Sequence, residues 1–184
     1  MGYTNTNQKL YFMKKQLVVF ALSMAFFVSC KSNDDTKIAE KDPQQTSIGV
    51  DSSANINLAK KVNDLAMKFD YEGLKSNFIP KAKLHDNSKD ITIDDNIATL
   101  KMVQKEGIVI SVNGEPLFHE VIMDKPNPKT GISNYVICYY DVTFAKGDKK
   151  VNIKNYHMLF AIKDGKVHEC WDIYDASELP SLFQ

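Results

Sequence analysis

The sequence predicts an α+β domain over residues 55–184, preceded by an N-terminal leader and a polar tether. Three observations support this. Apolar residues recur at helical spacing in the first half of the domain. They alternate with polar residues between turn dipeptides in the second half. A short apolar run ends in a cysteine near the N-terminus. The apolar content of 43% is ordinary for a folded protein and argues against a disordered chain.

The N-terminal segment has the features of a signal peptide. Met13 is followed by two lysines and is the predicted true start, so residues 1–12 come from an upstream misreading of the gene. Residues 17–28 form an almost unbroken apolar run, shorter than the roughly 20 residues that cross a membrane but typical of a signal-peptide core. The run ends in the letters FVSC, which resemble the lipobox of bacterial lipoproteins, although phenylalanine stands where leucine is usual.

This resemblance implies that residues 1–29 are removed and that Cys30 is acylated, which would anchor the protein to the membrane. The alternative is an uncleaved N-terminal helix with an incidental cysteine. Residues 30–54 are predicted to be the lipidated cysteine followed by a flexible tether, because they are polar and lack apolar periodicity. The letters KSNDD resemble an acidic sorting tag, which implies the outer membrane of the cell envelope and a surface-exposed position.

The first part of the domain is predicted to be helical. Helical spacing of apolar residues begins after Asn55 and continues to Phe69. A shorter helical turn over 71–78 is stopped by a proline, and 83–86 is predicted as a brief strand. A further helix over 94–106 has acidic residues in its first turn, which favours a helix start.

The rest of the domain is predicted to be an antiparallel sheet. Asn113-Gly114 is a hairpin dipeptide, predicted to join strands at 108–112 and 117–123. The turns Gly147-Asp148 and Asp164-Gly165 are predicted to link three more strands into a meander. These strands cover 135–144, 151–162 and 167–174, and a helical turn over 177–183 follows.

The C-terminal letters FAIKDGKVHECWDIYDASELPSLF resemble the end of SnoaL-like polyketide cyclases, in the nuclear transport factor 2-like superfamily. The element order resembles that superfamily over residues 55–184. The resemblance implies a cone-shaped fold, with N-terminal helices packed on a curved antiparallel sheet around a cavity. It also implies a possible homodimer through the convex side of the sheet. His85-Asp86 resembles the mouth of the family's cavity, which makes His85 a candidate ligand-binding residue; a surface loop is the simpler reading.

The two tight turns also predict the register of the last three strands, because loop length fixes strand pairing. Two-residue turns place His157 opposite Cys138 on one neighbouring strand and opposite Asp172 on the other. Cross-strand partners share a face, so the predicted row is Cys138–His157–Asp172. Cys138 and Cys170 would lie on strands separated by a third strand. This separation is too large for a disulfide, so we expect two free thiols.

Tyr140, Asn155 and Tyr174 are predicted on the same face as this row, as ligand-binding candidates. The opposite face carries Tyr139, Tyr156, Met158 and Trp171, and this bulkier face could line the cavity instead. Trp171 is therefore also a ligand-binding candidate.

Three functions follow as hypotheses. The first is an exported lipoprotein whose pocket binds a small apolar ligand. The second is an isomerase or cyclase in which His157 and Asp172 perform acid–base catalysis; the SnoaL-like resemblance implies such an acid on the last strands. The third is an interaction module that holds a protein partner in the envelope. A structural ion pair is the simpler account of His157 and Asp172.

Charge and motif content exclude other classes. Three of the 23 lysines lie in the leader and the chain contains no arginine, so the mature form has 20 lysines against 23 acidic residues. Nucleic-acid binding is not expected without a basic face or arginine. The four histidines lack metal-ligand spacing, and no glycine-rich phosphate loop is present, so neither a metal nor a cofactor is predicted.

Overall fold

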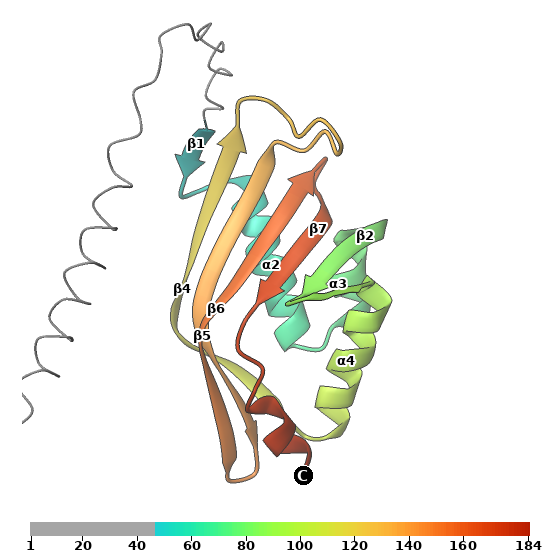
Figure 1. The fold of residues 1–184 in the computed structure, drawn as a ribbon, viewed down its shortest axis with the longest axis vertical. Coiled ribbons are helices and arrows are strands. Elements are labelled where there is room, and N and C mark those ends of the chain that lie inside the picture. The colour runs from blue at the N-terminus through green and yellow to red at the C-terminus, as the bar shows by residue number, and fades with distance from the viewer. Residues whose placement is uncertain (1–46) are drawn as a thin grey trace, which may run out of the picture. The chain divides into compact units, whose positions relative to one another are not determined.

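The computed structural model describes residues 47–184, which form one α+β domain with a curved seven-stranded sheet. The predicted signal peptide, Cys30 and most of the tether lie outside these residues. Figure 1 shows the long central strands curving around the helices. The strand order is β1-β4-β5-β6-β7-β2-β3. The strands are β1 (Ser47–Val50), β2 (Phe78–Asp86), β3 (Lys89–Ile91), β4 (Val109–Met123), β5 (Asn134–Lys146), β6 (Lys149–Lys163) and β7 (Lys166–Ile173).

The helices begin where the sequence supplies side chains that satisfy free backbone N–H groups. The side chain of Ser53 accepts a hydrogen bond from the N–H of Ile56 at the start of α2 (Ala54–Met67). Asp70 caps the short α3 (Tyr71–Ser76). Thr92 and Asp95 form a capping box at α4 (Ile93–Lys105). A 3₁₀ helix, η2 (Leu179–Phe183), ends the chain. The predicted helices are confirmed to within a few residues.

Three predictions about the sheet are wrong in part. First, the sheet is mixed rather than antiparallel, because β2 pairs with β7 in parallel. Second, the end of the predicted tether belongs to the domain, since β1 pairs with the end of β4. Third, Asn113-Gly114 does not form a hairpin. It lies at an irregularity inside β4, and both halves of this strand pair with β5. Gly114 has a φ of 79° there, so the residue provides a bulge instead of a turn.

The turn at Gly147-Asp148 is as predicted, but a bulge then shifts the register between β5 and β6. Lys146 pairs with Lys149 and Val142 with Ile153, after which Tyr140 pairs with Tyr156. One residue of β5 therefore faces two residues of β6 at this point. Asn155 takes up the extra length at a φ of 54°, which asparagine tolerates better than most residues. Its N–H donates a 2.9 Å hydrogen bond to Asp141 Oδ1.

A second bulge shifts the register between β6 and β7. Ile162 pairs with Val167 as predicted, but Ala161 pairs with Glu169, which leaves His168 as the extra residue. The two bulges cancel for β5 relative to β7 and turn the middle of β6 over. The predicted row Cys138–His157–Asp172 is therefore wrong. The observed row is Cys138–Met158–Asp172.

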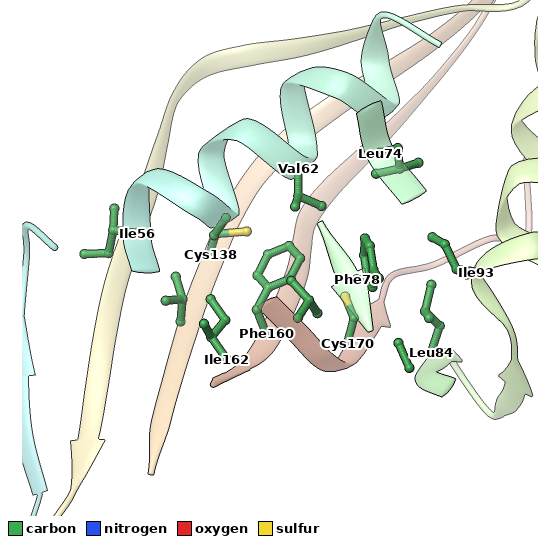
Figure 2. Close-up of a cluster of buried hydrophobic side chains, with 14 of the residues drawn as sticks. Ile56, Val62, Leu74, Phe78, Leu84, Ile93, Cys138, Phe160, Ile162 and Cys170 are labelled. Atoms are coloured by element: carbon green, nitrogen blue, oxygen red, sulfur yellow. The ribbon is translucent and has the colours of Figure 1, made fainter. Parts of the chain in front are cut away.

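The core lies between the concave face of the sheet and the helices. Figure 2 shows Ile56 and Val62 of α2 above side chains of the sheet that include Cys138 and Phe160. Cys138 and Cys170 are both buried and free, on strands separated by β6, as the strand spacing predicted. A second cluster packs η2 against β5 and β6 through Leu182. Within residues 47–184, no helix is long and apolar enough to cross a membrane.

Candidate functional site in the concave cavity

A cavity of about 270 Å³ lies on the concave side of the sheet. Its walls come from α2, α3, α4 and η2 on one side and from inward-facing residues of six strands, β2 to β7, on the other. Most of the lining is apolar. The polar exceptions are Asn63, Asp86, Asn96, Thr99, Tyr140, Tyr156, Cys170, Asp172 and Tyr174. A concave, mostly apolar space with a few convergent polar groups is the usual form of a small-molecule site.

Two carboxyl groups lie side by side in this lining. Asp86 at the end of β2 is the register partner of Asp172 on β7, and both side chains line the cavity. Neighbouring strands are roughly 4.8 Å apart, so paired residues on one face are in close proximity. Asp172 is only 8% exposed. Asp86 Oδ1 is buried without a hydrogen-bond partner, and it is the one such side-chain oxygen or nitrogen found in residues 47–184.

Burial and the charge of the neighbouring Asp86 raise the pKa of Asp172 to about 7. Removal from water disfavours the charged form of a carboxyl, and a nearby negative charge disfavours it further. The only hydrogen bond to the Asp172 side chain within the described domain is a weak one from the Cys170 thiol, with Sγ 3.9 Å from Oδ1. Asp172 therefore changes its protonation state close to neutral pH.

Three tyrosines form a stack beside the carboxyl pair. The rings of Tyr140 and Tyr156 are 5.5 Å apart and those of Tyr156 and Tyr174 are 4.7 Å apart, with interplanar angles of 14° and 16°. Burial raises the pKa of all three hydroxyls, so each remains a hydrogen-bond donor. The charge of Asp86 and a side-chain hydrogen bond with Asp86 raise the pKa of Tyr174 further. The stack thus places aromatic rings and hydroxyl groups in the lining that holds the carboxyl pair.

The structure brings together only part of the predicted site. Asp172, Tyr140 and Tyr174 line the cavity. His157 does not, because the bulge at Asn155 turns it to the outer face, where it is exposed and pairs with Tyr139 and Ile173. The predicted contact between His157 and Asp172 is therefore wrong. Asn155 is also exposed, because its backbone forms the bulge.

Trp171 and His85 also lie outside the cavity. They stack on the outer face, with ring centroids 5.1 Å apart. His85 contacts Asp90 Oδ1 through Nδ1 at 2.7 Å and Glu169 Oε1 through Nε2 at 2.8 Å. Burial alone would lower the pKa of His85, but these two carboxylates outweigh it and raise the pKa. His85 is thus held in an ion-pair cluster, and its placement at the cavity mouth is wrong.

The sequence did not predict a role for Asp86 in the cavity, and it did not predict that Tyr156 and Met158 share a face with Tyr140. In the sequence, Asp86 is notable only because it follows His85 in the His85-Asp86 dipeptide. Asp86, and not His85, lines the cavity. Tyr156 and Met158 were assigned to the face opposite Tyr140, but they line the cavity with it. The Tyr140 hydroxyl donates to Met158 Sδ at 3.4 Å. No signal in the sequence marks the bulge that brings them together.

Metal ligation is not supported among residues 47–184, where no group of three or more histidine, cysteine or acidic side chains could hold an ion. The two aspartates are the only carboxylates among the described residues that line the cavity. Hard cations take six or more oxygen ligands, many of which this lining does not supply.

Comparison with solved structures identifies the fold. An NTF2-like protein from Burkholderia xenovorans LB400 superposes with a TM-score of 0.53 at 14% identity, over 73% of this chain and 100% of that one. A protein described as a SnoaL-like polyketide cyclase, from Shewanella putrefaciens CN-32, gives 0.50 at 17% identity, over 72% and 86%. An LEH-like epoxide hydrolase of M. tuberculosis gives 0.50 at 11% identity, over 70% and 88%.

The described domain therefore has the nuclear transport factor 2-like fold, as the C-terminal letters predicted. At these identities the likeness shows the fold alone, and proteins of one fold perform many functions. No family profile matches the chain, and no curated protein matches its sequence.

Proposed function

We propose that the domain binds a small, mostly apolar molecule in its concave cavity. The observation that carries the proposal is the cavity itself, about 270 Å³ of space with mostly apolar walls and a few polar side chains that include Asp86, Asp172 and Tyr174. Apolar walls supply affinity through the burial of hydrocarbon, at roughly 25 cal/mol per Å². The few polar groups would fix the orientation of the ligand.

A cavity-filling pair of variants tests this proposal. Ala66 on α2 lines the cavity, whereas Ala98 on α4 is exposed and does not. A ligand found by thermal-shift screening stabilises the protein by mass action. Ala66→Leu should reduce the ligand-induced shift in Tm strongly, because the added carbons occupy ligand space. Ala98→Leu adds the same atoms elsewhere and should leave the shift unchanged. Equal shifts in both variants would place the ligand outside the cavity.

A second candidate function is acid–base catalysis inside the same cavity. The observation that favours it is the pKa of Asp172, about 7, because a general acid or base works best when its pKa is near the working pH. Asp172 would move the proton and Tyr174 would donate to a substrate oxygen. His157 has no part in this revised proposal.

Proton exchange provides a direct assay of this second function. Ketones of suitable size are incubated with the protein in D₂O, and deuterium uptake next to the carbonyl is followed by NMR. The wild-type chain should accelerate uptake, and Asp172→Asn should abolish the acceleration without unfolding the domain. A rate that does not depend on Asp172 would exclude this residue as the base.

We also infer that the outer face of the sheet binds a second copy of the chain. This face carries large apolar side chains that are well exposed, with Leu117 at 48%, Ile137 at 36% and Ile173 at 58%. Exposed apolar patches commonly mark interfaces. Ile173→Lys should convert a dimer to a monomer in sedimentation experiments. A chain that is already monomeric at high concentration would refute the inference.

Export and lipid anchoring through Cys30 are proposed from the sequence alone. They predict that Cys30→Ser abolishes incorporation of labelled fatty acid and releases the protein from the envelope fraction. A surface-exposed outer-membrane position predicts that protease added to intact cells removes the domain. Fatty-acid labelling that persists in the Cys30→Ser variant would contradict the assignment.

A further inference from the structure

We propose that the natural ligand of the cavity is an apolar molecule bearing one protonated amino group, which binds between Asp86 and Asp172. The inference rests on the proposed function above and specifies the chemical class of the ligand. It follows from the charge of the lining, from the sparse hydrogen bonding of the carboxyl pair and from the aromatic rings of the cavity.

The charge of the lining is one-sided. Asp86 and Asp172 both contribute to the wall, and none of the described residues that line the cavity is lysine, arginine or histidine. A carboxylate or phosphate ligand would enter a low-dielectric space against like charges. Like-charge contact costs several kcal/mol in such settings. A ligand carrying a positive charge would instead compensate the charge that the protein leaves uncompensated.

The hydrogen-bonding capacity of the pair points the same way. Asp86 Oδ1 is buried without a partner. Asp172 is 8% exposed, and its side chain accepts only the weak hydrogen bond from Cys170 within the described domain. Leaving a buried acceptor unsatisfied is unfavourable, and it is more unfavourable for a charged group. An ammonium group has three donors and can reach both carboxylates, whereas a neutral hydroxyl has one donor.

The aromatic stack favours a cation as well. Tyr140, Tyr156 and Tyr174 line the same cavity as the carboxyl pair, and Tyr140 and Tyr174, at the two ends of the stack, each have one ring face that Tyr156 does not cover. The face of an aromatic ring attracts a cation, and the attraction grows when water is excluded. The hydrocarbon part of the ligand would then fill the space between α2 and α4, which is lined by side chains such as Val62, Leu100 and Val103.

Matched ligands that differ only in the polar end group test the proposal. The purified chain is titrated by calorimetry at pH 7.5 with 4-phenylbutylamine, 4-phenylbutan-1-ol and 4-phenylbutanoate, and with octylamine, octanol and octanoate. In at least one series the amine should bind ten-fold or more tightly than the alcohol, and the carboxylate should not bind measurably. Two hydrocarbon shapes are used so that a poor fit of one does not decide the result.

Variants then assign the preference to the carboxyl pair. Asp86→Asn and Asp172→Asn should each weaken binding of the amine at least ten-fold and change binding of the alcohol less than three-fold. Asp148→Asn removes a charge from the exposed β5–β6 turn and should change neither. Thermal unfolding of each variant confirms that the fold is retained.

The outcomes separate this inference from the one on which it depends. If the alcohol binds as tightly as the amine, or the carboxylate binds best, the amine proposal is overturned while the cavity remains a binding site. The amine proposal is also overturned if the two Asn variants leave the ratio of amine affinity to alcohol affinity unchanged. That result would indicate that Asp86 and Asp172 share a proton and do not bind the amine. If no compound binds in either series, the cavity proposal fails and this one fails with it.

Discussion

Replacing Asp172 with asparagine should make the domain more stable, and the gain should grow with pH. Asparagine has nearly the same shape but cannot ionise, so the variant removes only the cost of a buried charge. In the unfolded chain the carboxyl has its ordinary pKa of 3.8, whereas in the folded domain burial and Asp86 raise the pKa to about 7. The folded protein therefore holds this proton more tightly than the unfolded chain does.

The sign of the pH dependence follows from this difference. Between about pH 4 and pH 7 the unfolded chain has released the proton and the folded domain still binds it, so rising pH favours unfolding. A shift of about three pKa units corresponds to about 4 kcal/mol once both states are ionised. About 2.5 kcal/mol of this falls between pH 5 and pH 8. The wild-type protein pays this cost and Asp172→Asn does not.

The assay is urea unfolding of both proteins at unit intervals from pH 5 to pH 8. The ionisation of His85 also contributes to the pH dependence of stability. Its raised pKa gives stability that is present at low pH and lost as the pH rises. This contribution cancels in the difference between the two proteins, and Asp148→Asn serves as the surface control. A stability difference that stays constant from pH 5 to pH 8 would refute the raised pKa and the buried position of the charge.

Three further predictions concern other positions. Burial raises the pKa of Cys138 to about 12 and that of Cys170 well above its ordinary value, so Ellman's reagent at pH 8 should not label either thiol until urea unfolds the chain; rapid native labelling would contradict their burial. Asn155→Gly should keep its stability while Asn155→Val loses about 1–2 kcal/mol, because a β-branched residue is strained at positive φ; equal urea midpoints would argue against the bulge. Glu120 is 1% exposed and accepts hydrogen bonds from two asparagine amides at 2.6 and 2.7 Å, so Glu120→Ala should cost about 3 kcal/mol in chemical unfolding and Glu120→Gln less.

Local signals determined most elements of this domain. The spacing of apolar residues located α2 and α4, and Gly147-Asp148 and Asp164-Gly165 located the turns of the C-terminal meander. Each of these features depends on residues close together in the chain, and so it can be read from the sequence. The fold class could be predicted for the same reason, together with the characteristic C-terminal letters. The likeness to solved structures confirms it.

Only the tertiary structure decided which side chains of β6 face the cavity and which residues make up the site. Both faces of β6 carry bulky residues, with Tyr156 and Met158 on one and His157 and Leu159 on the other, so the hydrophobic pattern could not reveal the extra residue at Asn155. A shift of one residue turns every later side chain to the opposite face. Asp86 lies beside Asp172 because β2 and β7, which are far apart in the chain, pair in parallel. No local pattern specifies this pairing. The sequence thus determined most of the helices and strands, and long-range pairing determined which side chains meet in the cavity.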